Sequence, residues 1–317
     1  MQVKTITVVG AGQLGSGIAQ VGLTSGLNVI LRDISDDLVN RGVATIKGNL
    51  ERQVERGRMT AQEKDKLLSR LTPTTDMRQA QKAQVVIEAV FERFEIKRQV
   101  LVEADSVCPP ETILASNTSS IPITKLAAAT KRPEKVIGMH FMHPVPIIGL
   151  LEIVRGYLTS DDTYDTIVQL GKAMGRKPIR LANDYAGFAN TQKKIRSELD
   201  DHSKINELLW QIIEGKRTPQ QIEASEKMGL GEGMSPLAYV DFIGLDTWLN
   251  IGNVLFEEYG LPKLYPCPLL RRLVEAGQLG IKTGVGFYDY SKSGRKAQDL
   301  SQRLLDFIKP LPAEVPV

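Results

Sequence analysis

Two of the three histidines in this chain, His140 and His143, lie in one short run from Gly138 to Pro144. Glu152 follows in the next apolar run. A strand, a turn and a returning strand would bring His140 and Glu152 together, and a carboxylate beside an imidazole orients and polarises a general base. The spacing is equally compatible with a hydrogen-bonded core histidine and an unrelated surface glutamate. We treat His140 and Glu152 as a candidate catalytic pair.

Zinc binding is the other chemistry that two nearby histidines could support. His140 and His143 are at positions i and i+3 of an expected extended segment, so they would point to different faces of it. The two cysteines, Cys108 and Cys267, are far from them in sequence and have no metal-ligand spacing. We therefore predict no metal at this site.

A polar cluster, Ser116-Asn117-Thr118-Ser119-Ser120, follows Ala115 at the end of another β-rich run. Its hydroxyl groups could hydrogen-bond a substrate oxygen, or they could cap the helix that follows. Both roles stay open for different residues of the cluster.

The segment Ile6–Asp33 has the order apolar run, glycine-rich turn, helix-like stretch, second apolar run and acidic residue. The turn is Gly10-Ala11-Gly12-Gln13-Leu14-Gly15. Glycines let backbone N–H groups approach a pyrophosphate at a helix N-terminus, and a carboxylate about 20 residues on accepts the hydroxyls of an adenosine ribose. This order predicts a dinucleotide site. Asp33 would repel a 2′-phosphate and so favours NAD over NADP, an effect that the neighbouring Arg32 partly offsets.

The elements that must position these residues follow from the hydrophobic runs. Short β-rich runs alternate with amphipathic helical stretches through the first half of the chain. This alternation predicts an α/β fold of the Rossmann-like kind, a doubly wound, mostly parallel sheet with helices on both faces. The expected strands are Ile6–Val9, Val29–Leu31, Val85–Glu88, Thr112–Ala115, Val136–His140, Leu150–Val154 and Pro178–Leu181.

A charged excursion from Ser35 to Arg70 separates the second expected strand from the third. A broken apolar stripe indicates one helix, and Thr60-Ala61-Gln62-Glu63 is the pattern of a capping box that opens a second. Four basic side chains of the excursion could bind an anionic ligand, but a solvated helix face is the better interpretation. They are Lys47, Arg52, Arg56 and Arg58.

Helical patterns replace the alternation beyond Asn183. We therefore predict two domains, an NAD-binding Rossmann-like domain over residues 1–183 and an all-helical domain over residues 184–317. A helix is expected at Asp161–Met174 in the first domain. Those expected in the second are Ile205–Glu214, a helix entered at Thr218-Pro219, and helices within Val240–Tyr259 and Leu269–Ala276.

Composition argues against several other classes of protein. The chain has 317 residues, 42% hydrophobic and 24% charged, and its net charge of +3 gives no sign of nucleic-acid binding. No apolar stretch has the roughly 18 residues that a membrane helix needs, and the first strand begins too close to Met1 for a signal peptide. Two isolated cysteines fit a reducing compartment. We expect a cytoplasmic protein with neither membrane nor nucleic-acid partners.

Four separated motifs together resemble the 3-hydroxyacyl-CoA dehydrogenase family, and within it the bacterial 3-hydroxybutyryl-CoA dehydrogenases. The resemblance implies an NAD-dependent oxidoreductase that interconverts an L-3-hydroxyacyl thioester and a 3-oxoacyl thioester. It also implies two domains and a homodimer formed through the helical one. The motifs are Gly10–Gly15 with Asp33, Ala115–Ser120, His140–Glu152 and Gly280–Tyr288.

The resemblance implies roles for individual residues. His140 corresponds to the catalytic base, Glu152 to its orienting partner, and Ser119 to a serine that hydrogen-bonds the reacting oxygen and the nicotinamide. Removing a hydroxyl proton and a hydride together needs one base, one hydride acceptor and donors to the oxygen. Further cofactor-contacting positions are matched by Glu92, Lys97, Lys282 and, where the family usually has asparagine, His143.

The chain departs from the family pattern after Asp184. Ala186 replaces a usual proline, and the stretch Ala189–Lys204, which includes the polar segment Gln192–Lys204, is longer than its family counterpart and almost wholly polar. Asn190 corresponds to the family's active-site asparagine displaced by one residue, with Thr191 at the aligned step. Because the segment has only two large apolar residues, we expect a solvent-facing element in place of a buried helix. Its basic residues could face a phosphopantetheine, an acidic carrier surface or only water; they are Lys193, Lys194, Arg196 and Lys204.

Several functions are compatible with this sequence. The first hypothesis is an NAD-dependent dehydrogenase of a 3-hydroxyacyl thioester carried by CoA. A biosynthetic dehydrogenase would instead act on an acyl group held by an acyl carrier protein. A sugar-acid dehydrogenase resembling the lambda-crystallin branch would keep the histidine and the glutamate without a thioester. The non-enzyme alternative is a nucleotide-binding scaffold, against which Ser119, His140 and Glu152 argue.

Overall fold

The computed structural model describes residues 2–181, 184, 195–225, 235–291 and 299–308. The chain divides into two compact units, the first ending at Ile195 and the second beginning at Arg196. The predicted domain boundary, after Asn183, lies next to residues outside the described part, so its position stays a prediction.

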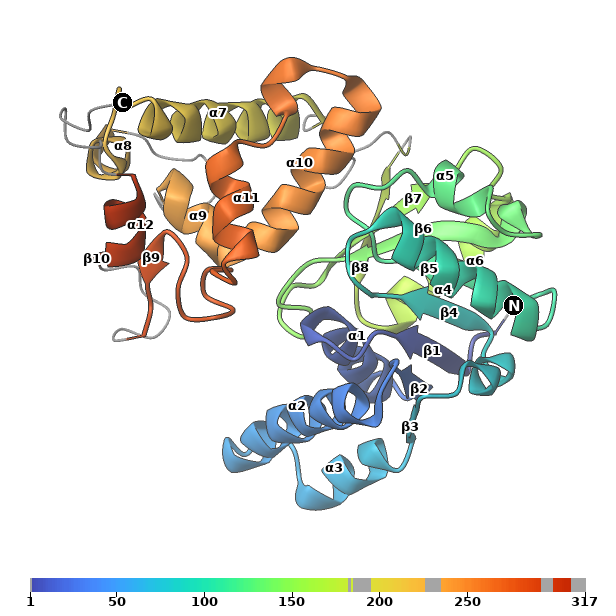
Figure 1. Cartoon of the computed structure of the whole chain (residues 1–317). Coiled ribbons are helices and arrows are strands. Elements are labelled where there is room, and N and C mark those ends of the chain that lie inside the picture. Colours follow the sequence, from blue (N-terminus) through green and yellow to red (C-terminus); the bar gives the residue numbers. More distant parts are fainter. Residues whose placement is uncertain (1, 182–183, 185–194, 226–234, 292–298, 309–317) are drawn as a thin grey trace. The chain divides into compact units, whose positions relative to one another are not determined.

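An eight-stranded sheet forms the centre of the first unit (Figure 1). The strand order is β3-β2-β1-β4-β5-β6-β7-β8; β7 is antiparallel to β6 and parallel to β8, and the other neighbours are parallel. The order reverses between β1 and β4, and open α/β sheets bind ligands at the carboxyl ends of strands at such a point. The strands are β1 Thr5–Val9, β2 Asn28–Arg32, β3 Leu71–Thr74, β4 Val85–Glu88, β5 Ile113–Ser116, β6 Val136–Phe141, β7 Leu150–Arg155 and β8 Lys177–Leu181.

The predicted doubly wound, mostly parallel sheet is confirmed, and each expected strand is present with its ends shifted by at most one residue. β3 is an addition that the sequence did not predict. It has only 4 residues, none of them fully buried, and it contains Pro73. Proline is tolerated in β3 because this strand lies at the edge of the sheet, where one side needs no partner.

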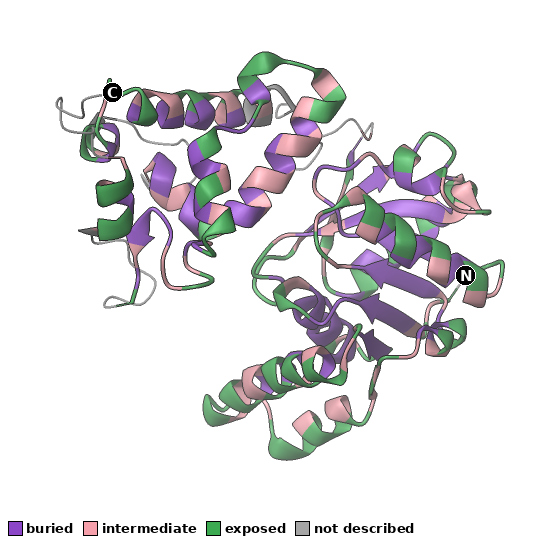
Figure 2. Cartoon of the chain, in the orientation of Figure 1, coloured by how far each residue is buried: buried purple, intermediate pink, exposed green. Residues whose placement is uncertain are grey.

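Helices flank this sheet, and most of its strand residues are buried (Figure 2). Aliphatic side chains of the strands and of α1, α2 and α6 form its core. α3 begins at the predicted capping box, in which Thr60 and Glu63 each bond the other's backbone N–H. The four basic residues of the excursion are exposed on α2 and the turn after it, as expected of a solvated face. The helices are α1 Gln13–Thr24, α2 Asp36–Glu55, α3 Ala61–Leu68, α4 Phe94–Val107, α5 Ile123–Ala127 and α6 Asp161–Ala173, with 3-10 turns η1 Met77–Lys82 and η2 Pro133–Lys135.

The second unit is mainly helical, as predicted, with a small antiparallel strand pair that the sequence did not predict. Gly244, with a φ of +102°, separates α9 from α10 within the stretch where the sequence indicated helical segments. The elements are α7 Ile195–Ile213, α8 Pro219–Ser225, α9 Pro236–Ile243, α10 Leu245–Tyr259, η3 Pro262–Leu264, α11 Pro268–Glu275, β9 Tyr288–Asp289, β10 Asp299–Leu300 and α12 Gln302–Phe307.

The family-like motif near the end of the chain wraps around a buried carboxylate in this unit. Asp241 accepts the backbone N–H groups of Phe287 and Tyr288, each at 2.9 Å, and the hydroxyl of Tyr290 at 3.0 Å. A Cβ at Gly286 would overlap the Asp241 carboxylate. This part of the motif therefore serves the packing of the second unit.

The expectation for the polar segment Gln192–Lys204 is wrong at one position. α7 runs from Ile195, and its residue His202 is 4% exposed. The His202 ring stacks on Trp248 of α10, with centroids 3.7 Å and planes 10° apart. A histidine counts as polar in a sequence pattern, but the faces of its ring pack well on an indole. The segment therefore contributes a buried residue to the second unit in place of a wholly solvent-facing surface.

Burial lowers the pKa of His202 to about 3, and its Nε2 has no hydrogen-bond partner among the described residues. The unfolded chain binds a proton below about pH 6.5, whereas the folded chain leaves His202 neutral until near pH 3. The unfolding free energy of the second unit should therefore fall as the pH drops below about 6.5, by up to about 1.4 kcal/mol per pH unit. Above about pH 6.5, His202 should not make the unfolding free energy depend on pH.

Urea unfolding followed by tryptophan fluorescence checks this, because both tryptophans, Trp210 and Trp248, lie in the second unit. The variant His202→Phe keeps an aromatic ring on Trp248 and removes the titrating group, so its midpoint should depend less on pH between 6.5 and 4.5. His143→Gln, at an exposed histidine of the first unit, is the control and should follow the wild type. Identical pH slopes for wild type and His202→Phe would contradict the prediction.

Candidate active site

The three glycines of the turn between β1 and α1 differ in how much space surrounds them. Gly10 has a φ of +106°, and a Cβ there would lie 2.5 Å from the carbonyl oxygen of Ala89. A Cβ at Gly15 would overlap the carbonyl oxygen of Gly10. A Cβ at Gly12, in contrast, would meet nothing within 4 Å. The fold requires Gly10 and Gly15, whereas Gly12 leaves open space at the start of α1.

The N-terminus of α1 is open to an anion. Gly12 is the N-cap and forms no side-chain capping bond, and the first turn has no acidic residue. Gly12 and Gln13 are exposed and Leu14 is half-buried. Unpaired N–H groups and the helix dipole favour a phosphate at such a place. The absence of a side chain at the N-cap therefore fits the pyrophosphate of a dinucleotide.

Asp33, just after β2, lies against the same turn. One of its carboxylate oxygens accepts the N–H of Ala11 at 2.6 Å, and the other accepts that of Ile34 at 2.7 Å. A carboxylate has about four lone-pair positions, so capacity remains for ribose hydroxyls. The guanidinium of Arg32 bonds the carbonyl of Thr75 at 3.3 Å and lies near Glu103. The Arg32 guanidinium is therefore occupied by other groups, so it offsets the repulsion between Asp33 and a 2′-phosphate less than expected.

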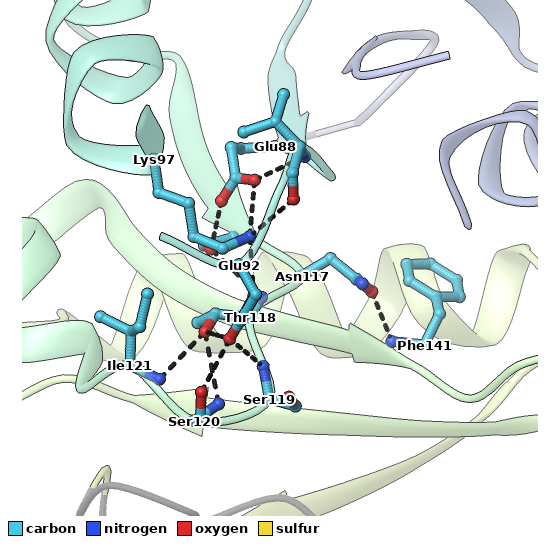
Figure 3. A network of polar contacts seen from close by, with 11 residues as sticks. Glu88, Glu92, Lys97, Asn117, Thr118, Ser119, Ser120, Ile121 and Phe141 are labelled. Carbon is cyan, nitrogen blue, oxygen red and sulfur yellow. Dashed lines mark hydrogen bonds and ion pairs between the residues drawn. The ribbon is translucent and has the colours of Figure 1, made fainter. Parts of the chain in front are cut away.

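Glu88, Glu92 and Lys97 form a buried ionic cluster at the carboxyl end of β4 (Figure 3). Lys97 is 1% exposed, and its ammonium bonds Glu88 Oε1 at 2.8 Å, Glu92 Oε2 at 3.1 Å and the carbonyl of Val90 at 3.2 Å. Glu88 Oε2 accepts the hydroxyl of Ser116 at 2.5 Å. All three donors of the ammonium are thus used within the protein. A contact between Lys97 and the cofactor stays a prediction.

Glu92 connects this cluster to the polar loop after β5. Its Oε1 accepts the hydroxyl of Thr118, the N–H of Ser119 at 3.2 Å and the hydroxyl of Ser120 at 2.9 Å. Burial opposes ionisation, but Lys97 and these hydroxyls hold the pKa of Glu92 below its usual value. Burial likewise works against the Lys97 charge, but the neighbouring carboxylates raise the pKa of Lys97. Glu92 and Lys97 are therefore both charged at neutral pH.

The predicted catalytic pair is brought together by β6 and β7. In their antiparallel register His140 stands opposite Glu152, and His140 Nδ1 lies 2.9 Å from Glu152 Oε2. His140 is 12% exposed and Glu152 is fully buried, so Glu152 is not an unrelated surface charge. His140 Nε2 forms no hydrogen bond with any described residue. The arrangement is an imidazole held at one nitrogen by a buried carboxylate.

The other predicted site residues of the first unit are Ser119, His143 and Asn190. Ser119 is half-buried, and its hydroxyl forms no hydrogen bond with a described residue. His143 is exposed beyond the end of β6. Asn190 and Thr191 lie outside the described residues, so which of them replaces the family's asparagine stays a prediction.

Lys282 belongs to the second unit. Its ammonium bonds Asp246 at 2.7 Å and the hydroxyl of Thr247 at 2.9 Å. A Cβ at Gly244 would overlap the Lys282 side chain, so this glycine makes room for it. A role for Lys282 in closing over the cofactor stays a prediction.

Glu88 was not identified from the sequence as a site residue. The residue ends the apolar run Val85–Ile87, and a carboxylate that terminates a buried strand needs a partner. The position of Glu88 therefore could have predicted a buried ion pair, with Lys97 on the following helix as its partner. Sequence reasoning also named Asn117 only as one member of a polar cluster, although its side chain bonds the backbone of β6.

No group of three histidine, cysteine, aspartate or glutamate side chains in the described part of the chain could hold a metal ion. Within the same residues, no helix is both long enough and apolar enough to cross a membrane.

A phosphate site at the reversal point of a parallel sheet, with an imidazole at the end of a nearby strand, is typical of NAD-dependent dehydrogenases. Residues 5–185 match the 3-hydroxyacyl-CoA dehydrogenase NAD binding domain, and residues 202–290 match the 3-hydroxyacyl-CoA dehydrogenase C-terminal domain. The chain belongs to the 3-hydroxyacyl-CoA dehydrogenase family, and its cofactor is NAD. The two matches leave residues 186–201 between them, which include most of the polar segment Gln192–Lys204.

Individual relatives agree with the family match. A probable 3-hydroxybutyryl-CoA dehydrogenase of Bacillus subtilis is 42% identical over 292 residues, which cover 92% of this chain and 99% of the relative. The crystal structure of (S)-3-hydroxybutyryl-CoA dehydrogenase PaaH1 from Ralstonia eutropha is 40% identical, with a TM-score of 0.76 over 92% of this chain and 100% of that one. The crystal structure of M. tuberculosis FadB2 is 38% identical, with a TM-score of 0.79 over the same shares.

Asp33 should determine the preference for NAD over NADP. We expect Asp33→Asn to weaken NADH binding by about 10- to 100-fold, because hydrogen bonds to a charged group contribute about 1.5–3 kcal/mol. We also expect it to narrow the preference for NADH over NADPH. Fluorescence titration with each cofactor measures both effects. Asp36→Asn, at an exposed acid nearby, is the control and should change neither. Equal catalytic efficiency of the wild type with both cofactors would contradict the prediction.

Proposed function

We propose that this protein interconverts an L-3-hydroxyacyl-CoA and the corresponding 3-oxoacyl-CoA by hydride transfer with NAD. The proposal is carried by the His140–Glu152 pair, 2.9 Å apart at the end of β6, in a chain with the NAD-binding domain of this family. Relatives named as 3-hydroxybutyryl-CoA dehydrogenases support the thioester as the substrate class.

His140 is the proposed base. An ionised carboxylate can only accept, so Glu152 selects the tautomer of His140 that carries its proton on Nδ1. Nε2 then presents a lone pair to the 3-hydroxyl group of the substrate. As Nε2 takes the hydroxyl proton, the imidazole becomes positively charged, and the buried Glu152 carboxylate stabilises that charge.

Ser119 is the proposed donor to the reacting oxygen. Its backbone N–H is fixed on Glu92, while its hydroxyl has no partner among the described residues. A hydroxyl near the substrate oxygen can donate to it and stabilise the charge that develops there. NAD supplies the hydride acceptor. In the reverse direction the same His140 returns its proton to the 3-oxo oxygen.

Loss of the base should reduce turnover without affecting cofactor binding. We expect His140→Ala to lower kcat by at least about 100-fold, because a general base contributes about that much to the chemical step. The NADH dissociation constant should stay within about threefold of the wild-type value, since a base adds little to adenosine binding. Initial rates and NADH fluorescence titrations measure the two effects.

Glu152→Gln is the companion variant and should lose less activity than His140→Ala. A glutamine keeps a hydrogen bond to the imidazole but cannot stabilise its positive charge. Near-normal turnover of His140→Ala would remove the assignment of His140 as the base.

The substrate class should emerge from a panel of substrates followed by NADH absorbance. We expect fast turnover with acetoacetyl-CoA, and at least about tenfold lower catalytic efficiency with the same acyl group on a carrier protein or with a free sugar acid. Such a ratio corresponds to about 1.4 kcal/mol of transition-state binding. The panel uses the wild-type protein, and heat-inactivated protein serves as the blank.

The other outcomes of this panel identify the alternatives. Preference for the carrier-bound substrate would assign the protein to biosynthesis, and preference for the sugar acid would assign it to lambda-crystallin-like chemistry. NADH binding without turnover of any substrate would favour a nucleotide-binding scaffold.

We propose a cytoplasmic homodimer formed through the second unit. Exposed large apolar side chains of that unit, among them Phe242, Tyr265 and Phe307, support an association surface. Both cysteines are buried and free, which fits a reducing compartment.

A further inference from the structure

β6 extends beyond the end of its neighbour β5, whereas it stays paired with β7. On the β5 side the register ends where Ser116 pairs with Gly138, whereas on the β7 side it continues to Phe141 opposite Leu151. His140 lies in this overhanging end. A strand end that is paired on one side leaves backbone groups on the other side without ladder partners.

The Asn117 side chain takes the place of the missing ladder partner (Figure 3). Its Oδ1 accepts the N–H of Phe141 at 2.8 Å. This N–H belongs to the peptide unit that joins His140 to Phe141, so the bond holds the backbone to which the imidazole is attached. Asn117 is 5% exposed, and water therefore competes little for the bond.

Asn117 is itself held in place. Its own N–H bonds the carbonyl of Glu88 at 2.8 Å, and the hydroxyl of the preceding residue, Ser116, bonds the Glu88 carboxylate. Because a backbone N–H needs an acceptor, the amide oxygen and not the amide nitrogen must face Phe141. A continuous path of fixed groups thus runs from Glu88 through Asn117 to the strand end that bears His140.

We propose that Asn117 is a positioning residue for His140. By accepting the N–H of Phe141, it keeps the end of β6 in the orientation that places His140 beside Glu152 and aims Nε2 at the substrate. This rests on the proposed function, in which His140 is the base. A displacement of about 1 Å in a reacting group lowers a rate by up to about 100-fold, so one buried bond at this point has a kinetic consequence.

Three variants test the proposal. Asn117→Ala should lower kcat by about 10- to 100-fold and leave the KM for acyl-CoA and the NADH dissociation constant within about threefold. Asn117→Asp, which keeps an acceptor oxygen for the N–H of Phe141, should recover most of the lost kcat. In a His140→Ala background, Asn117→Ala should cause no further loss, because positioning has nothing left to act on.

Thr159→Val is the matched control. The Thr159 hydroxyl is buried, donates to the carbonyl of Val136 at 2.6 Å and accepts the N–H of Gly156 at 2.9 Å. It therefore also ties a buried side chain to the backbone of β6, but at the other end of the strand and as a donor to it. Thr159→Val should reduce the thermal melting temperature about as much as Asn117→Ala while leaving kcat unchanged. This comparison separates positioning of His140 from a general loosening of the strand.

Four results would overturn the positioning role. They are a near-normal kcat for Asn117→Ala, an equal loss of kcat for Thr159→Val, an Asn117→Asp variant as impaired as Asn117→Ala, and a further loss in the double variant. A near-normal kcat for His140→Ala is a different result, because it refutes the proposed function itself.

Discussion

The rest of the site depends on the burial of the Lys97 ammonium between Glu88 and Glu92. A charge taken out of water costs several kcal/mol unless it is paired and hydrogen-bonded. One ammonium and two carboxylates leave an excess negative charge, which hydroxyl and backbone N–H donors of residues 116–120 accommodate. Without Lys97 the two carboxylates would face one another in a medium of low dielectric, at a cost of about 3–5 kcal/mol.

This cluster gives the carboxyl edge of the sheet a fixed geometry. In the middle of the sheet, backbone ladders and aliphatic side chains hold the strands together. At the edge the backbone ladders end, and polar side chains connect the strands: Glu88 at the end of β4, Ser116 at the end of β5, and Asn117 between β5 and β6. The apolar core thus determines where the edge lies. The polar contacts determine how the groups on it face one another.

The pattern of apolar residues was sufficient to predict the sheet, most helices and the candidate pair His140 and Glu152. It was insufficient wherever the outcome depended on a partner far away in sequence. Glu88 and Lys97 each look like ordinary charges until α4 brings them together, and His202 looks like a surface residue until Trp248 covers it. β3 was not predicted because its sequence, with Pro73 and no fully buried residue, has no strand pattern. It forms because its backbone pairs with β2 at the edge of the sheet.

The three glycines of the first turn have a consequence for evolutionary change. Side chains at positions 10 and 15 collide with the protein itself, so any descendant that still folds this way must keep glycine there. A side chain at position 12 collides with nothing in the protein. Only a bound dinucleotide selects against it. Among descendants of this chain, loss of Gly12 with retention of Gly10 and Gly15 would therefore mark lineages that have given up the cofactor while keeping the fold.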